Sequence, residues 1–156
     1  MIELQFADVI VPEIEALPGC QQWLEIAAQE VLRLAGEDAS DNMTIVLSDD
    51  DELRRLNMQF LENDVPTDVL SFPSGEYDPD TQANYLGDII ISLARAQMQS
   101  TQAGHPLKDE LQLLVVHGVL HLLGYDHLEE DEKVEMWRVQ AEALELLGCS
   151  PSAIPR

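Results

Sequence analysis

Three histidines lie within eleven residues in the second half of the chain. His117 and His121 are four residues apart in an apolar segment with helical periodicity, so their side chains project from one face of a helix. Gly124 permits the turn that ends this helix, and the short segment after it can bring His127 back as a third nitrogen ligand. Three neutral imidazoles suit zinc, with nickel, copper or iron as alternatives, and they leave a fourth position for water. The spacing therefore predicts a catalytic metal site with one zinc per chain.

The alternative interpretation is that these histidines cap or pack the helix, as a single histidine on an apolar helix does. We favour the metal because the two helical histidines share a face and a glycine precedes the third. Asp126, just before His127, is a candidate acceptor for the N–H of a ligand histidine. It is equally well placed as a turn residue before the next helix.

The residue after His117 separates this pattern from a related one. Zinc proteases of the metzincin class carry H-E-x-x-H-x-x-G-x-x-H, and the three histidines and Gly124 match its spacing. The glutamate that acts as general base in those enzymes stands where this chain has Gly118. The ligand spacing is shared, but the peptidase mechanism is not supported.

Hydrophobic periodicity predicts the elements that must position the histidines. Apolar residues alternate with polar ones at 2–6 and 43–47, and short apolar runs occupy 69–72 and 87–92, which predicts four strands. Four helices are predicted at 24–35, 49–60, 93–102 and 107–123. The apolar face of a fifth is formed by Val134, Trp137, Ala141 and Leu144.

The order of these elements predicts the fold class. We expect a single α+β domain over 1–147, with a mixed sheet of about four strands and about five helices packed on it. Residues 148–156 are predicted to form a tail. The polar, turn-rich stretch 73–85 is predicted to be a mobile loop.

Composition restricts the class of protein. The chain has 156 residues, a length typical of one domain, with 30 acidic against 8 basic side chains and a formal net charge of −22. Cys20 and Cys149 make no disulfide framework, and the most apolar stretch, 111–123, is too short to span a bilayer. The acidic start lacks the pattern of a signal peptide. We therefore expect a cytoplasmic protein without a membrane segment.

The acidity also bears on partners. An isoelectric point near 4.1 is the opposite of a nucleic-acid-binding footprint and favours a basic protein partner. A bound divalent metal would nevertheless add positive charge locally, where a polyanion could approach.

The sequence resembles the bacterial YbeY endoribonucleases, or rRNA maturation factors. The segment from His117 to His127 matches every fixed position of that family's pattern H-G-x-L-H-L-x-G-Y-D-H. Upstream, the segments PTDVLSFP at 66–73 and LGDIII at 86–91 resemble two more family segments, as does Leu56-Asn57. The resemblance extends over roughly residues 42–147.

The resemblance implies a single α+β domain with one zinc held by His117, His121 and His127. It implies a metal-dependent, single-strand-specific endoribonuclease that acts in 3′-end maturation of small-subunit (16S) rRNA and in ribosome quality control. The partners expected from it are precursor rRNA and proteins of the small ribosomal subunit. In the corresponding mechanism, zinc-activated water hydrolyses the RNA phosphodiester.

One position departs from the family pattern. Family members commonly carry an arginine directly after the aromatic residue that follows Leu-Asn, whereas here Phe60 is followed by Leu61. Such an arginine could bind phosphate in the cleft, and Leu61 cannot. Arg54 and Arg55 are candidate substitutes, although solvated surface charge is the simpler interpretation of both.

Other residues have two interpretations each. Thr67, Asp68 and Ser71 could line the cleft and contact substrate, or could shape the turn and strand they belong to. Asp68 and Asp126 are the candidate carboxylates for positioning a water molecule. We interpret Asp88 as structural, His105 as a surface residue and, from the stripe above, Trp137 as core.

Two other functions remain open at this point. A non-catalytic ribosome-associated assembly factor with a structural metal fits the net charge and Leu61. A zinc peptidase or amide hydrolase could use the same three histidines, but Gly118 argues against it.

Overall fold

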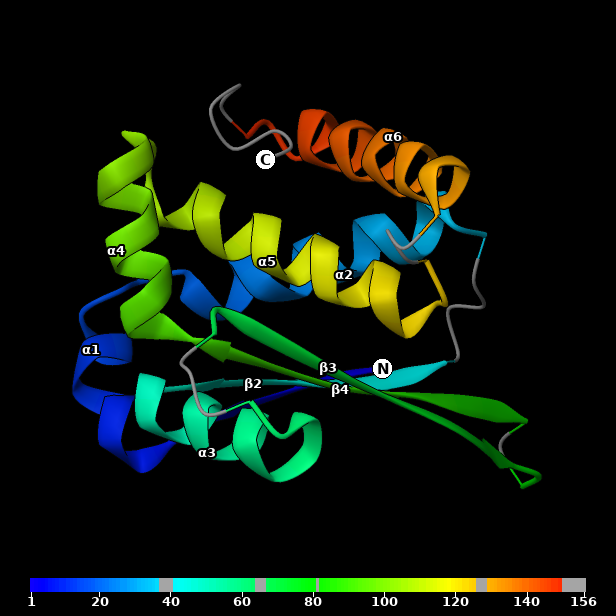
Figure 1. The fold of residues 1–156 in the computed structure, drawn as a ribbon, viewed down its shortest axis with the longest axis horizontal. Coiled ribbons are helices and arrows are strands. Elements are labelled where there is room, and N and C mark those ends of the chain that lie inside the picture. The colour runs from blue at the N-terminus through cyan, green and yellow to red at the C-terminus, as the bar shows by residue number, and fades with distance from the viewer. Residues whose placement is uncertain (37–40, 64–66, 81, 126–128, 150–156) are drawn as a thin grey trace.

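A computed structural model describes residues 1–36, 41–63, 67–80, 82–125 and 129–149 (Figure 1). Its centre is a four-stranded sheet with strand order β1-β2-β4-β3, formed by β1 (Ile2–Phe6), β2 (Asn42–Ser48), β3 (Val69–Asp78) and β4 (Ala83–Ser92). β1, β2 and β4 are parallel, and β3 is an antiparallel edge strand beside β4. The prediction of an α+β fold with a mixed four-stranded sheet is confirmed.

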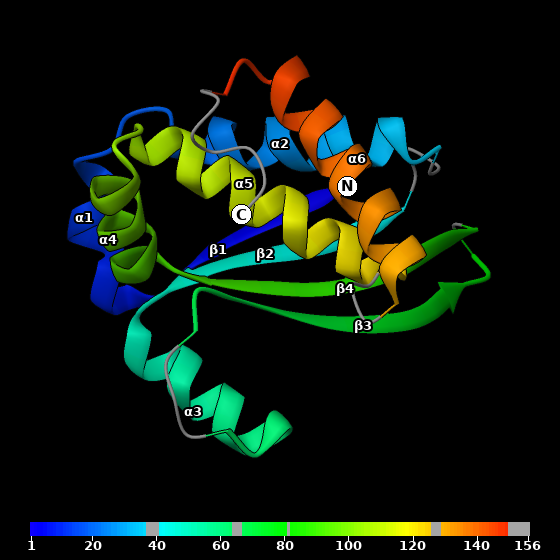
Figure 2. The ribbon, with the colours of Figure 1, turned by 45° about the horizontal axis from the view of Figure 1, so that its top comes forward.

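Six α-helices lie within the described residues: α1 (Val11–Glu15), α2 (Cys20–Leu34), α3 (Asp50–Leu61), α4 (Leu93–Ala103), α5 (Leu107–Leu122) and α6 (Glu130–Leu146). α5 and α2 lie on one face of the sheet with α6 over them, and α3 lies on the other face (Figure 2). α1 was not predicted from the sequence, because it is short, has a proline at its start and contains no buried residue that would give an apolar pattern. No helix in the described ranges is long and apolar enough to cross a membrane.

α5 is the central helix of the core. It packs on Ile89 and Ile91 of β4 and on apolar side chains of α2, α4 and α6. From Asp109 to Leu122 every residue of α5 is buried except His117 and His121, which are half-buried. Beyond its first two residues, α5 is therefore partly open to solvent only where the two histidines lie.

The prediction of a mobile loop over 73–85 is wrong. β3 continues through Pro73 to Asp78 and pairs with β4, with Asp78 opposite Ala83 and a bulge between Pro73 and Glu76. β3 is an edge strand with a bulge next to Pro73, and both settings tolerate a proline, which has no N–H to donate to a ladder. Glu76, Tyr77 and their neighbours are exposed, so no apolar alternation marks this part of the strand in the sequence.

Two further expectations are corrected. His105 is buried rather than on the surface: its Nε2 lies 2.7 Å from Oε1 of Glu110, and both side chains are fully buried. Trp137 is half-buried rather than core, and Val134 is 58% exposed. The buried face of α6 is instead formed by Met136, Val139, Gln140, Ala143 and Leu144. A polar residue, Gln140, lies on that face, so apolar periodicity alone selected a neighbouring stripe.

Candidate metal and catalytic site

The two imidazoles on α5 face one another. Nε2 of His117 and Nε2 of His121 are 3.1 Å apart, and the ring planes are inclined at 77°. Two nitrogens bound to a tetrahedral zinc at the usual bond length stand about 3.3 Å apart. The spacing of these two donor atoms therefore fits a shared transition-metal ion.

The third predicted ligand, His127, and the candidate carboxylate Asp126 lie outside the described residues. Within the described part of the chain, no group of three or more histidine, cysteine or carboxylate side chains could hold a metal. His117 and His121 thus form a two-nitrogen donor set, and the complete three-histidine site stays a prediction.

Gln140 of α6 contacts His117 from the side away from His121. Its Oε1 lies 2.9 Å from Nδ1 of His117, and the residue is 3% exposed. No motif in the sequence singled out Gln140. The available signal was a polar side chain at a buried position of an amphipathic helix, but the expected stripe on α6 excluded that position.

A small cavity of about 130 Å³ opens beside His117. It is lined by Asp68, Leu113, Leu114, His117, Trp137 and Gln140. Of the predicted cleft residues, the structure thus brings Asp68 next to a candidate ligand. No lysine or arginine is among these six lining residues, so they supply no cation for a phosphate.

The other two predicted cleft residues differ in what they contact. The hydroxyl of Ser71 donates a hydrogen bond to the carbonyl oxygen of Gly118 at 3.1 Å, which ties β3 to α5 beside the histidines. Thr67 is half-buried just before β3. The backbone oxygen of Asp68 accepts a hydrogen bond from the Ser92 N–H at 2.9 Å, which anchors the start of β3 to the end of β4.

Gly118 is required by packing. A Cβ atom at this position would lie 2.9 Å from Cγ2 and 3.1 Å from Cδ1 of Ile89 on β4. The face of α5 next to His117 therefore lies directly on the sheet. A glutamate there, as in metzincins, would have no room and would not reach the opening where the histidines lie.

The opposite face of the sheet carries a larger hollow of about 860 Å³, beside α3. Its acidic lining residues are Asp8, Asp49, Asp51, Glu52 and Asp88. Arg55 also lines it, but its guanidinium is bound to the Glu52 carboxylate through two contacts of 2.9 and 3.0 Å. Asp88 accepts a hydrogen bond from the hydroxyl of Tyr85, consistent with its structural interpretation.

The candidate substitutes for the missing arginine do not line the cavity beside His117. Arg55 belongs to the hollow on the α3 side, and its side chain is 59% exposed. Leu61 ends α3 and is 60% exposed. The surface-charge interpretation of Arg55 is therefore favoured, and the six residues of the cavity remain without a cation.

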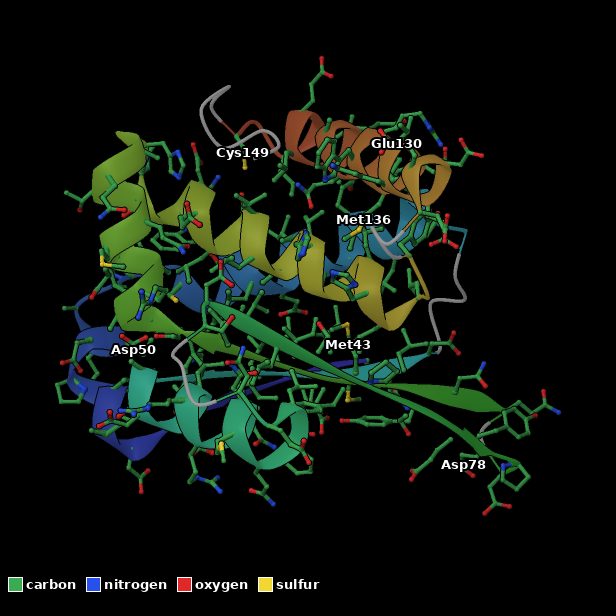
Figure 3. The ribbon with its side chains drawn as sticks, in the orientation of Figure 1. Met43, Asp50, Asp78, Glu130, Met136 and Cys149 are labelled. Atoms are coloured by element: carbon green, nitrogen blue, oxygen red, sulfur yellow. The ribbon has the colours of Figure 1, made fainter. Side chains whose placement is uncertain are left out.

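Figure 3 shows α6 beside α5, with Met136 labelled between the two helices. Met136, which it labels, lies on the face of α6 turned to α5, one turn before Gln140. The packing of α6 on α5 through this face also places Gln140 against His117. The site is therefore built by three elements: α5 carries the imidazoles, α6 supports them, and the start of β3 brings Asp68.

Comparison with known proteins gives one consistent result. The sequence model of the family described as "Endoribonuclease YbeY" matches residues 8–148. The chain is 44% identical to "Endoribonuclease YbeY" of Pelotomaculum thermopropionicum over 133 residues, covering 83% of this chain and 86% of that protein. It is 39% identical to the protein of the same name from Heliobacterium modesticaldum over 147 residues, covering 88% and 87%. A solution structure from Thermotoga maritima superposes with a TM-score of 0.59 at 29% identity, over 93% of this chain and 87% of that one.

Proposed function

The chain belongs to the YbeY endoribonuclease family, and from this premise we propose that it is a zinc-dependent, single-strand-specific endoribonuclease of the cytoplasm. Its proposed task is maturation of the 3′ end of small-subunit rRNA and quality control of ribosomes. The observation that carries the proposal is the pair of Nε2 atoms 3.1 Å apart where α5, otherwise buried beyond its first two residues, is partly open to solvent. Membership of this family supports an RNA substrate and a metal-dependent reaction.

His117, His121 and His127 are the proposed metal ligands, for one zinc per chain, with nickel or another transition metal as the alternative. A zinc ion there would stabilise charge on a phosphoryl oxygen and lower the pKa of a water molecule. The half-buried imidazoles are compatible with a substrate that approaches from solvent, because a closed structural site would have no open position.

The chain's own residues have proposed roles around these ligands. Asp68 lines the cavity beside His117, and we assign it the positioning of the attacking water and acceptance of its proton, with Asp126 as the other candidate. Ser71 holds β3 against α5 through Gly118 and so keeps Asp68 in place. Thr67, adjacent to Asp68, completes the proposed substrate cleft.

Proteins of the small ribosomal subunit are the proposed partners, in addition to precursor rRNA. The support is electrostatic. Five carboxylates line the hollow beside α3, and the one arginine among its lining residues is already paired with Glu52. Such a surface attracts a basic protein and repels RNA. RNA is therefore proposed to enter on the α5 side of the sheet.

Cleavage of precursor rRNA tests the activity directly. Wild type, His117→Ala and Asp68→Asn are incubated with a precursor 3′ end, and the metal content of each preparation is measured. We expect one zinc in wild type, metal loss and no cleavage in His117→Ala, and retained metal with slowed cleavage in Asp68→Asn. Purified wild type that binds no added zinc, or cleavage that survives in His117→Ala, would contradict the proposal.

A second candidate function is supported by the residues of the cavity. Because none of its lining residues is a lysine or arginine, and Leu61 replaces the family's usual cation, the chain could act as a non-catalytic assembly factor. That role predicts binding to small subunits without RNA cleavage, and unaltered binding in Asp68→Asn. The peptidase alternative is disfavoured by the packing of Gly118, and a casein control in the same assays checks it.

A further inference from the structure

A buried side-chain contact connects α6 to the metal-binding face of α5. Gln140 is 3% exposed, and its Oε1 lies 2.9 Å from Nδ1 of His117. The same imidazole directs its other nitrogen, Nε2, at Nε2 of His121. Gln140 thus touches the ring atom that a metal bound at Nε2 does not use.

We infer that Gln140 is a positioning residue that holds His117 in its metal-binding tautomer and so strengthens metal binding. The inference rests on the proposed function, because it assumes that Nε2 of His117 is a ligand atom. Gln140 lies on α6, outside the histidine motif, and no sequence pattern indicated that it belongs to the site.

A neutral imidazole has two tautomers, and only one of them can bind a metal through Nε2. The proton is on either Nδ1 or Nε2, and only the nitrogen without it has a lone pair for a metal. A carbonyl oxygen accepts hydrogen bonds and cannot donate one. Oε1 of Gln140 therefore stabilises the tautomer with the proton on Nδ1, and the lone pair of Nε2 is left at the opening.

Burial makes this selection effective. In water, either nitrogen of a histidine finds a partner, so neither tautomer is enforced. Here the Oε1 acceptor is enclosed between α5 and α6, and leaving it unpaired would cost about 1–3 kcal/mol. The hydrogen bond also fixes the rotation of the ring, which directs Nε2 at the same point as that of His121.

Three variants separate this role from a general effect on packing. Gln140→Met keeps the length of the side chain and removes the acceptor, whereas Gln140→Glu keeps an acceptor. Gln112→Met is the matched control, because Gln112 on α5 is 2% exposed and donates to the Trp23 carbonyl oxygen rather than contacting a histidine. Zinc dissociation constants are measured by competition with a chromogenic chelator, on full-length protein shown to be folded by circular dichroism.

We expect Gln140→Met to bind zinc about 10- to 100-fold more weakly than wild type, the usual effect of losing such a supporting partner. Gln140→Glu should restore binding to at least the wild-type level. Gln112→Met should bind zinc normally even if its melting temperature falls. Equal zinc affinity in wild type and Gln140→Met would overturn the inference, and so would equal losses in Gln140→Met and Gln112→Met.

A second measurement works without metal. Nitrogen-15 spectra of the imidazole rings, recorded on metal-free protein, report which nitrogen of His117 carries the proton. We expect it on Nδ1 in wild type and redistributed in Gln140→Met. A wild-type His117 protonated on Nε2 would overturn the inference. Failure of wild type to bind zinc, with the Nδ1 tautomer present, would instead contradict the proposed function and leave the role of Gln140 in orienting the ring intact.

Discussion

At the scale of single residues, the position after His117 shows how packing determines chemistry. At Gly118 the backbone of α5 approaches β4 so closely that Ile89 fills the space a side chain would need. The spacing of the histidines was visible in the sequence, and so was the absence of a glutamate. The reason for the glycine was not visible, because it depends on a contact between α5 and β4 that only the fold creates.

Gly118→Ala should destabilise the protein by about 1–3 kcal/mol, although alanine is the better helix former, because its Cβ would overlap Ile89. Denaturant unfolding measures the effect. Its control is a double-mutant cycle with Ile89→Ala, which removes the atoms that obstruct the new Cβ. In that background Gly118→Ala should be neutral or stabilising. The same loss in both backgrounds would refute the packing explanation.

Leu61 offers a second test at one position. Because it is 60% exposed at the end of α3, Leu61→Arg should leave stability unchanged. If a cation near the cleft matters, the variant should bind single-stranded RNA more tightly, with a steeper salt dependence. Leu146→Arg is the matched control, because Leu146 is a similarly exposed leucine at the end of α6. Equal gains in both variants would indicate a general charge effect, and no gain would show that the departure at Leu61 is unimportant.

At the scale of helices and strands, the buried segments could be predicted from the sequence and the exposed ones could not. β1, β2 and β4 have clear apolar signals because at least one of their faces is covered, and α5 was placed within one residue of its end. The distal half of β3 is exposed on both faces, so its paired backbone left no pattern in the sequence. The apolar face of α6 was misplaced because its buried surface includes Gln140.

The residues of the candidate site also differed in how far the sequence could predict them. His117 and His121 could be predicted because helix geometry alone places residues four apart on one face. Asp68 could be suggested but not placed. It lines the same cavity as His117, which is 49 residues away in the chain, and this placement depends on β3 pairing with β4. Gln140 and the burial of His105 depend on contacts between side chains, for which periodicity has no signal.

The helix layer above the sheet also predicts the reactivity of the two cysteines. Cys20 begins α2 and Cys149 follows α6, and both are buried as free thiols. Burial raises the pKa of Cys20, and it raises the pKa of Cys149 to about 11. Both thiols should therefore remain protonated at pH 8 and react with a disulfide reagent only as fast as the protein unfolds. Rapid labelling of native protein, compared with protein in denaturant, would contradict this packing.

At the scale of the whole molecule, the strongly negative net charge works against binding of RNA, the proposed substrate. The chain has thirty acidic side chains and only eight basic ones, so most of its surface repels a polyanion. The two faces of the sheet differ in the groups that they carry. The face beside α3 holds the acidic hollow, and the opposite face holds α5 with its two half-buried histidines. Under the proposed function, attraction of RNA must be local to the proposed metal site, whereas attraction of a basic protein can be distributed over a surface.

This division predicts how activity depends on the state of the substrate. With few phosphate contacts, binding of free RNA should be weak and should change little with salt, because few counterions are released. Docking on a basic protein of the small subunit should be stronger and should weaken as salt is added. The same precursor 3′ end should therefore be cleaved slowly as naked RNA and faster in assembled subunits, with the advantage declining over a salt series.

Variants of the acidic hollow make the test specific. Asp51→Asn with Asp8→Asn removes two charges from its lining without touching the α5 face. These changes should reduce cleavage in assembled subunits while leaving cleavage of naked RNA unchanged. Glu145→Gln with Glu142→Gln, on α6, is the control that removes the same charge elsewhere. Equal rates on free and assembled substrate would show that specificity resides in the proposed RNA cleft beside His117, because docking through the acidic face would then contribute nothing to recognition.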